Sequence, residues 1–361
     1  MSQQLTIPGY ADNVPGEVRR GAPLRAEEEG QVRAQSQPDV AEVLVKKHLP
    51  STRLHPLSQT AIPRLAKDRE ALRAISRAVG EFPTCHRLWL DDSRTMAHIP
   101  DESVHLVVTS PPYFDLKKYP DQEAQLGEIH DYEIFVKELG RVWAQCHRLL
   151  VKGGRLIIVV GDVCRSRREY GEHQVIPLHA SIAETCRELG FNNLATMVWH
   201  KISNAKFEVE NGTSFLGKPY EPNAVIKNDL EFILMQRKPG GYRRPTEAMR
   251  VLSLIGEKEH RSWFNQIVTF HGASTRAHPA PFPPELVEPL IRMFSFVGDT
   301  VLDPFSGTAT TTLAAARCGR NSIGIEVEPT YEALAVQRLT EAVRREKLQA
   351  TIQTLPRLST G

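Results

Sequence analysis

The chain has 361 residues, of which 41% are hydrophobic and 24% charged, and its formal net charge is +2. These values are ordinary for a soluble globular protein with one large or two smaller domains, and a polyanion partner would need a local basic face. The sequence has no run of 18 apolar residues, so it predicts no membrane span, and the N-terminus lacks a signal-peptide pattern. The five cysteines show no CxxC spacing, which argues against a disulfide framework or zinc site and for a cytoplasmic setting.

Residues 1–55 are rich in Gln, Glu, Pro, Gly and Arg and show no sustained periodicity. This composition predicts a flexible N-terminal arm, and an arm that orders on DNA or on a partner subunit is the alternative. Apolar residues at helical spacing then predict a helix over 60–82. Its basic residues lie off the apolar stripe, which favours a solvated face over a DNA-contacting one.

Strands and helices alternate from residue 86 onward. The predicted strands cover 86–90, 104–109, 155–160, 194–199, 230–235, 300–303 and 321–326, and the predicted helices cover 130–150, 175–190, 285–296 and 330–345, with another ending near 316. This alternation predicts an α/β fold with a doubly wound, mostly parallel sheet that is covered on both faces. A polar connector over 201–222 and a basic, irregular stretch over 237–275 interrupt it.

A proline-rich turn follows the strand at 104–109. Ser110, Pro111, Pro112 and Tyr113 leave a hydroxyl, rigid carbonyls and an aromatic face where the strand ends. Ligands of open α/β sheets bind at the carboxyl ends of the strands. The turn is therefore predicted to face a ligand.

A second turn follows the strand at 300–303 and opens a helix. The turn has no GxGxxG or GK[ST] pattern to hold phosphates, and Glu326 falls 19 residues after Gly307, close to the spacing at which a carboxylate meets ribose hydroxyls. The ligand that this turn still suits is a nucleoside without phosphate, and S-adenosyl-L-methionine fits that description. The alternative for the turn alone is a tight strand-to-helix connection.

Together the two turns resemble motifs of the amino-methylating DNA methyltransferases, which modify cytosine N4 or adenine N6. The residues that carry the likeness are Asp303-Pro304-Phe305-Ser306-Gly307 and Ser110-Pro111-Pro112-Tyr113, within a resemblance over residues 85–340. The catalytic turn comes first, which resembles the circularly permuted β class. The resemblance implies a seven-stranded Rossmann-like methyltransferase sheet with irregular target-recognition insertions. Ala309 departs from the pattern, since many members carry a second Gly there, and it could trim cofactor affinity.

This resemblance divides the chain at residues 56, 201, 276 and 346. We expect the catalytic half of the domain over 56–200, and its end with the target-recognition insertions over 201–275. The cofactor-binding half is expected over 276–345 and a C-terminal tail over 346–361.

The resemblance also implies roles in methyl transfer to an exocyclic amine. We expect Ser110 Oγ and the Pro111 carbonyl to accept the two N–H groups of the amine, and Tyr113 to stack on a base flipped out of the duplex. Ser-Pro-Pro-Tyr is more typical of enzymes that act on cytosine N4, and adenine N6 is the alternative. An RNA amine methyltransferase and a relative that has lost catalysis are further alternatives. A C5-cytosine mechanism is rejected, because no cysteine sits in a Pro-Cys turn after a strand.

Residues expected to bind the cofactor lie at three strand ends and in a proline-rich turn. They are Asp303, Phe305, Ser306, Gly307, Thr308, Glu326, Asp92, His278 and Pro279. A helix N-cap is an equal alternative for Asp92, and a turn residue before proline is the alternative for His278. Asp162, which ends another strand, could shape the base pocket.

Basic residues near the expected substrate side are predicted to contact DNA phosphates. They are Lys117, Arg165, Arg167, Arg168, Lys201, Lys218, Arg243 and Arg244. A single such cluster is more often a solvated surface, and the stretches 163–175, 203–222 and 240–275 are the ones predicted to recognise the target. Double-stranded DNA is the expected partner, with a cognate restriction endonuclease and a homodimer as further expectations. The expected location is the prokaryotic cytoplasm, associated with the nucleoid, and no metal is expected.

Overall fold

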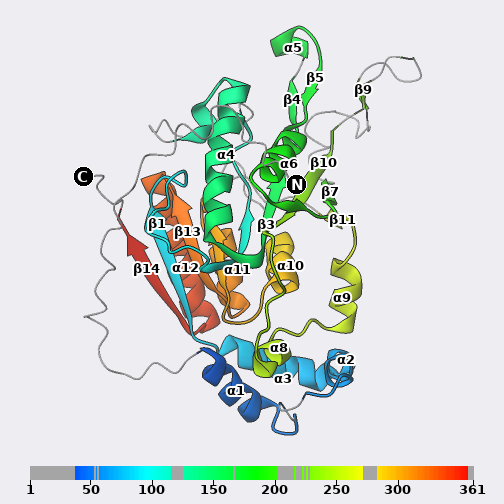
Figure 1. Ribbon diagram of the computed structural model, residues 1–361, viewed down its shortest axis with the longest axis vertical. Coiled ribbons are helices and arrows are strands. Elements are labelled where there is room, and N and C mark those ends of the chain that lie inside the picture. Colours follow the sequence, from blue (N-terminus) through cyan, green and yellow to red (C-terminus); the bar gives the residue numbers. More distant parts are fainter. Residues whose placement is uncertain are drawn as a thin grey trace, which may run out of the picture.

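The computed structural model describes residues 37–356 apart from 53, 55–56, 115–124, 166, 202–214, 217–221, 223–224, 227 and 271–282. A ten-stranded sheet forms its centre (Figure 1), in the order β11-β7-β10-β3-β2-β12-β13-β1-β14 with β6 beside β10. The strands are β1 (Thr84–Leu90), β2 (Val104–Thr109), β3 (Leu150–Val160), β6 (Asn192–Asn193), β7 (Met197–Lys201), β10 (Leu230–Arg237), β11 (Ile267–Phe270), β12 (Thr300–Asp303), β13 (Asn321–Glu326) and β14 (Ala350–Leu355). All neighbours along this order pair in parallel except that β10 is antiparallel to β3 and β7, which confirms the mostly parallel α/β fold. The sheet has three strands more than the seven expected, because β6, β11 and β14 extend it.

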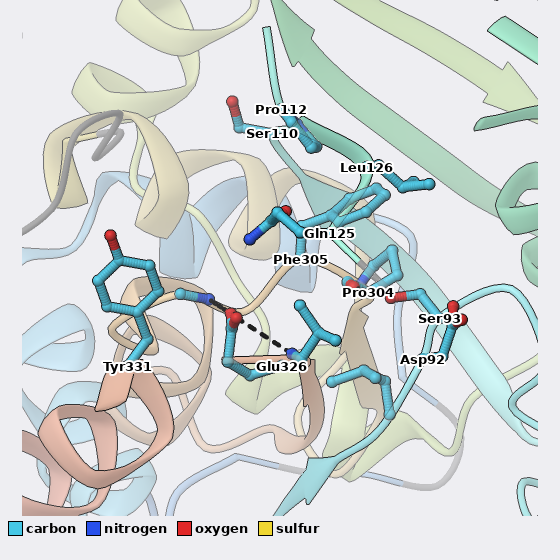
Figure 2. A pocket seen from close by; sticks show the side chains of 13 residues that line it. Asp92, Ser93, Ser110, Pro112, Gln125, Leu126, Pro304, Phe305, Glu326 and Tyr331 are labelled. Carbon is cyan, nitrogen blue, oxygen red and sulfur yellow. Dashed lines mark hydrogen bonds between the residues drawn. The ribbon is translucent and has the colours of Figure 1, made fainter. Parts of the chain in front are cut away.

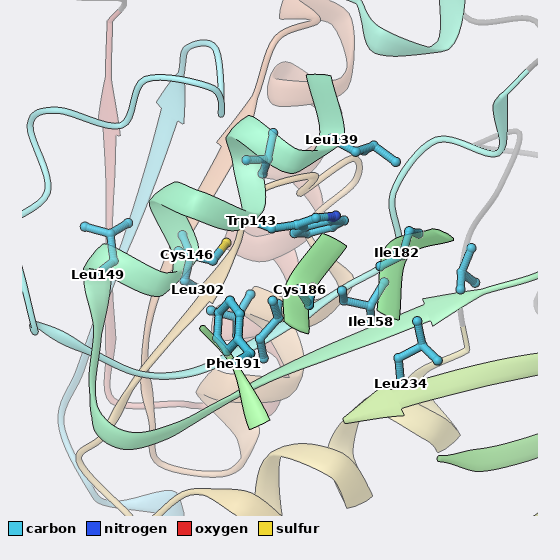
Figure 3. Close-up of a cluster of buried hydrophobic side chains, with 14 of the residues drawn as sticks. Leu139, Trp143, Cys146, Leu149, Ile158, Ile182, Cys186, Phe191, Leu234 and Leu302 are labelled. Atoms are coloured by element: carbon cyan, nitrogen blue, oxygen red, sulfur yellow. The ribbon is translucent and has the colours of Figure 1, made fainter. Parts of the chain in front are cut away.

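Helices cover both faces of the sheet. On one face lie α4 (Tyr132–Leu149) and α6 (Leu178–Glu188), and on the other lie α10 (Pro284–Phe294), α11 (Thr310–Arg317) and α12 (Pro329–Glu346). Trp143 and Cys146 of α4 pack with Ile158 of β3 and Leu234 of β10 in the larger core (Figure 3). Apolar residues on both faces of the central strands explain the continuous apolar run of β3.

Two short hairpins extend from the end of the sheet where the parallel strands have their carboxyl ends, called here the carboxyl edge. One pairs β4 (Val163–Arg165) with β5 (Gln174–Ile176) and carries α5 (Arg167–Tyr170), and the other pairs β8 (Phe215–Leu216) with β9 (Val225–Ile226). Both lie at the top of Figure 1, above the strands' carboxyl ends.

The helices at the opposite edge form a third layer. They are α1 (Gln37–His48), α2 (Ala61–Lys67), α3 (Arg69–Gly80) and α8 (Glu247–Leu252), at the bottom of Figure 1, and α1, α3 and α8 bury a shared apolar cluster. The prediction of a flexible arm is therefore wrong for α1, because Ala41 and Val45 are fully buried one turn apart. The single helix predicted over 60–82 is two helices, because Asp68 caps α3 by accepting from the backbone N–H groups of Glu70 and Ala71.

Two other boundary predictions fail. Residues 237–275 are not irregular throughout, because they contain α8, α9 (Glu257–Trp263) and β11. The predicted tail contains β14, which pairs with β1 from Thr84 to Trp89. Among the described helices, none combines the length and apolar character that crossing a membrane requires.

Candidate active site

The two predicted turns lie side by side where β2 and β12 end. These strands pair in parallel, with Leu106 opposite Val301 and Val107 opposite Leu302. The chain continues from β2 to β3 on one side and from β12 to β13 on the other. The order in which the chain adds strands to the sheet therefore reverses between β2 and β12. Open α/β sheets bind ligands at such a switch point.

Asp303 joins the two turns from inside the protein. It is 1% exposed, and its carboxylate accepts from the hydroxyls of Thr109 at 2.7 Å and Thr311 at 2.6 Å and from the N–H of Phe305 at 3.0 Å. Burial raises the pKa of Asp303, and the two hydroxyls and the N–H oppose that shift. Asp303 does not line the cavity described below, so its place in the structure is to fix the turn rather than to face a ligand.

The second turn begins α11 through a left-handed backbone. Gly307 and Ala309 both have positive φ, at 50° and 59°. Glycine takes such angles without steric cost, so glycine is the residue that this backbone favours at both positions. The Ala309 methyl group is fully buried in an apolar cluster with Leu88 and Leu313, so packing offsets part of the backbone strain.

Thr308 and Ser306 have different surroundings within this turn. Arg338 of α12 donates to the carbonyl of Thr308 at 2.9 Å and to its hydroxyl at 3.2 Å. Ser306 is 5% exposed, its N–H donates to Ile325, and its hydroxyl has no hydrogen-bond partner among the described residues. Neither side chain lines the cavity, whereas Phe305 and Gly307 do.

Glu326 ends β13 and faces this turn (Figure 2). Its Oε2 accepts from Gly307 N–H at 2.7 Å, and its Oε1 accepts from the N–H groups of Val327 and Glu328 at 3.1 and 3.0 Å. Burial raises the pKa of Glu326 to about 7, against the opposing effect of these donors. A carboxylate has about four lone-pair directions, so one remains for a further donor.

A cavity opens between the two turns, with about 590 Å³ of empty space that includes its open mouth. It is lined by Asp92, Ser93, Ser110, Pro112, Gln125, Leu126, Pro304, Phe305, Gly307, Ile325, Glu326, Val327 and Tyr331. Figure 2 shows Ser110 and Pro112 on one side of this space and Glu326 and Tyr331 on another. Two carboxylates and no basic side chain lie among these described residues, which suits a cationic or neutral ligand better than a phosphate.

Asp92 lies on the cavity wall in a fixed orientation. Its carboxylate accepts from Arg94 Nε at 3.0 Å and Nη2 at 2.7 Å, and also from the backbone N–H of Arg94 at 2.9 Å. Arg94 Nη1 donates to Glu138 of α4 at 2.6 Å. Asp92 lines the cavity, so a contact with the cofactor stays a prediction. The helix N-cap alternative is wrong, because residues 91–103 form turns and no helix begins there, and the N–H that Asp92 accepts from belongs to a turn.

The turn at residues 110–113 places its polar atoms beside β10. Pro111 and Pro112 are buried. The hydroxyls of Ser110 and Tyr113 lie 3.2 Å apart, and Tyr113 donates to Glu231 of β10 at 3.3 Å. Beyond this turn, Asp162 accepts from His179 Nδ1 at 2.6 Å, and the His179 ring stacks on Phe232.

The basic residues predicted to contact DNA do not share one face. Arg165 and Arg167 lie in the hairpin beyond the carboxyl edge, where the Arg165 guanidinium is 4.7 Å from the centre of the Tyr170 ring. Arg243 lies at the opposite edge and makes a bidentate ion pair with Asp299, which precedes β12 and is 1% exposed. A buried carboxylate holds the Arg243 side chain, so the structure does not bring Arg243 or its neighbour Arg244 together with Arg165 and Arg167.

Several predicted residues cannot be placed. Lys117, Lys218, His278 and Pro279 lie outside the described residues, as do most of residues 203–222 and the side chains of Arg168 and Lys201. Within the described part of the chain, no cluster of three or more His, Cys, Asp and Glu residues could hold a metal ion.

Sequence reasoning missed Glu231, Gln125, Leu126 and Tyr331. Glu231 was hidden in an apolar strand, and its position between Leu230 and Phe232 was the only signal of a buried carboxylate. Tyr331 lies just after a strand-end acidic residue, at the start of α12, where a helix places side chains over the preceding strand end.

Comparison with known proteins adds three findings. The family model for N6 and N4 methyltransferases, described as DNA methylase, matches residues 104–337. The type II methyltransferase M.MjaI of Methanocaldococcus jannaschii is 35% identical over 289 residues, which cover 72% of this chain and 92% of the relative. The DNA adenine methyltransferase YhdJ of Escherichia coli is 28% identical over 258 residues, covering 68% of this chain and 79% of the relative.

A solved structure gives the same fold. A protein of Thermus thermophilus, assigned as a DNA modification methylase and solved in complex with S-adenosyl-L-methionine, is 48% identical to this chain. The likeness covers 75% of this chain and 98% of the other, with a TM-score of 0.63.

Proposed function

We propose that this chain, which belongs to the N6/N4 family of DNA methylases, transfers a methyl group from S-adenosyl-L-methionine to the exocyclic N4 amine of a cytosine in a specific DNA sequence. The observation that carries the proposal is the position of Ser110, whose side chain lines the same cavity as Glu326. One cavity wall then faces a nucleophile and another faces the nucleoside part of the cofactor.

The cavity fits S-adenosyl-L-methionine in its charge and in its polar groups. Its described lining has two carboxylates and no cation to bind phosphate. Glu326 keeps one lone-pair direction for a ribose hydroxyl, and Tyr331 and Phe305 supply apolar surface for adenine. When bound, the cofactor supplies an electrophilic methyl group on a sulfonium. Asp92 is positioned to accept from the nucleoside or to balance positive charge.

The catalytic turn would hold the amine in a reactive orientation. An exocyclic amine is a weak nucleophile, because its lone pair is delocalised into the ring. Acceptors at Ser110 Oγ and the Pro111 carbonyl would hold both N–H groups and favour a pyramidal nitrogen. Because the turn is rigid and Pro111 and Pro112 are buried, these acceptors need little reorganisation.

The flipped base would stack on Tyr113. Stacking of a base on an aromatic ring contributes about 1–3 kcal/mol and helps to repay the cost of extruding the base. The hairpin that carries Arg165 and Arg167 projects from the same edge, so it is the described segment best placed to meet the DNA backbone. M.MjaI is named a type II methyltransferase, which supports a cognate restriction endonuclease as a partner.

The order of the two turns along the chain supports assignment to the permuted β class. The catalytic turn at residues 110–113 precedes the cofactor turn at 303–309, although the turns meet in space.

A nucleoside analysis tests the choice of base. The protein is incubated with methyl-tritiated cofactor and unmethylated duplex DNA, and the DNA is digested to nucleosides. Label in N4-methylcytosine is the expected result. Label in N6-methyladenine would sink the cytosine assignment, and label that requires RNA would sink both DNA assignments.

Adenine N6 is the second candidate function. Its support is the likeness to YhdJ, which is named a DNA adenine methyltransferase. The catalytic geometry would serve either amine, because both bases present an amine with two N–H groups. Ser110, in place of the Asp typical of adenine enzymes, favours cytosine.

A further inference from the structure

Glu231 reaches the catalytic turn from a strand that runs against its neighbours. Because β10 is antiparallel to β3 and β7, its first residues lie at the edge where the other strands end. Glu231 is 8% exposed there, and its Oε2 accepts from the Tyr113 hydroxyl at 3.3 Å. Gly161 lies beside both side chains, since a Cβ atom there would be in ordinary van der Waals contact with Glu231 Cγ at 3.4 Å and with Tyr113 Cε1 at 3.5 Å.

The number of protons on each group determines which one donates in the contact between Tyr113 and Glu231. A carboxylate has no proton to donate, and a phenol has one. Since Tyr113 gives its proton to Glu231, the contact of 3.2 Å between the Tyr113 and Ser110 hydroxyls must use the proton of Ser110. The hydrogen bonds then run from Ser110 to Tyr113 and from Tyr113 to Glu231.

We infer that Glu231 is a positioning residue that turns the Ser110 hydroxyl proton away from the substrate, so that Ser110 Oγ presents only lone pairs to the incoming base. The inference rests on the proposed function, because it concerns the atom that would accept from the amine. Glu231 acts on Ser110 through Tyr113 and does not have to contact the base itself.

This polarity selects the chemical group that the site accepts. An amine offers N–H donors to the lone pairs of Ser110, whereas the carbonyl of thymine or guanine offers lone pairs that they repel. Without Glu231, Tyr113 could donate to Ser110, and the Ser110 proton could then point toward the base. Glu231 would thus favour amino bases over carbonyl bases at the catalytic turn.

A double-mutant cycle between Glu231 and Tyr113 tests the inference. Glu231→Leu removes both carboxylate oxygens, and Tyr113→Phe removes only the hydroxyl and keeps the ring for stacking. Single-turnover methyl transfer to unmethylated duplex DNA is measured for both variants and for the double variant, at saturating cofactor. Each single variant is expected to lower the rate on the order of tenfold, the effect of one lost hydrogen bond. The double variant should lose at most about twofold more, because both changes break the same chain.

Glu231→Gln serves as the conservative variant, because its amide oxygen still accepts from Tyr113. Its rate should fall between those of the wild type and Glu231→Leu, and it allows the cycle to be completed if the leucine variant does not fold. Cofactor affinity, measured on each variant, should stay near the wild-type value, since Glu231 does not line the cofactor cavity. The unfolding midpoint of each variant is measured as well, and rates are compared only among variants that are folded at the assay temperature.

Two results would overturn the inference. One is an unchanged rate in Glu231→Leu, and the other is a double variant whose loss is the product of the two single losses, because Glu231 would then act independently of Tyr113. The nucleoside that carries the label is a separate outcome. Label on adenine would reject the cytosine proposal, while the cycle would still decide the role of Glu231.

Discussion

One oxygen of Asp303 accepts from the Thr109 hydroxyl at 2.7 Å and from the Phe305 N–H at 3.0 Å. Thr109 is the last residue before the turn at residues 110–113, and Phe305 lines the cavity between the two turns. A single buried carboxylate oxygen therefore sets the distance between the two turns whose ligands must meet. Small displacements at such a position are costly, because near-attack geometry tolerates little error.

Thr109→Val should destabilise the protein and slow methyl transfer. Valine keeps the shape of threonine but leaves the Asp303 carboxylate without one donor, which costs about 1–3 kcal/mol in a buried site. Denaturant unfolding measures the loss. Thr312→Val is the matched control, because the Thr312 hydroxyl is buried with no hydrogen-bond partner among the described residues. That control should be neutral or stabilising, and equal losses in both variants would contradict the importance of the Thr109 contact.

Cofactor affinity should rise from about pH 6 to about pH 8. Glu326 has its pKa raised to about 7, so roughly a tenth of it is ionised one unit below that value. The ionised carboxylate is the better acceptor for ribose hydroxyls, and affinity should increase up to about tenfold over this range. Calorimetric titration at each pH measures the change.

The same ionisation has the opposite effect on the ligand-free protein. Because the folded pKa exceeds the ordinary value of 4.5, Glu326 contributes stability below about pH 4.5, and this contribution is lost as the pH rises through about 7. Glu326→Gln should flatten both pH dependences and bind the cofactor more weakly. An unchanged pH profile in this variant would assign the titration to another group.

Ser110→Ala and Tyr113→Ala should lose turnover and keep cofactor binding. Removing one preorganised hydrogen-bonding group at a reacting centre typically lowers kcat by about 10²–10³. Loss of the Tyr113 ring removes stacking worth about 1–3 kcal/mol, so DNA-dependent base flipping should weaken too. Single-turnover rates and equilibrium cofactor binding separate the two effects, and full activity in both variants would refute the assigned mechanism.

Arg243 and Arg167 should respond to alanine substitution in opposite ways. Arg243→Ala leaves Asp299 buried without its partner, which should cost about 3 kcal/mol of folding free energy and leave the salt dependence of DNA binding unchanged. Arg167 is exposed on the hairpin. Arg167→Ala should leave stability unchanged and reduce the salt slope of DNA binding by about 1. The reverse pattern would restore Arg243 as a DNA contact.

The sheet and the positions of both turns were predictable, because strongly apolar strands alternate with amphipathic helices and special turn residues mark where strands end. The helix α1 was not, although residues 40–45 are mostly apolar, because this short apolar segment follows a long polar stretch without periodicity. The α3 and α8 surfaces that bury Ala41 and Val45 lie elsewhere in the chain. The ion pair of Arg243 with Asp299 was equally invisible. It joins residues 56 positions apart, and a basic pair in a polar stretch looks the same whether it faces phosphate or a buried carboxylate.

The match to the family ends at residue 337, but the sheet does not. β14 ends at Leu355 and pairs along nearly the whole of β1, so without it β1 would become an outer strand with an unsatisfied row of backbone donors and acceptors. Leu88 and Trp89 of that strand would then be available to pair with other chains. The shortest piece of this protein that remains monodisperse should therefore extend to residue 356, nineteen residues beyond the boundary that family likeness alone would draw.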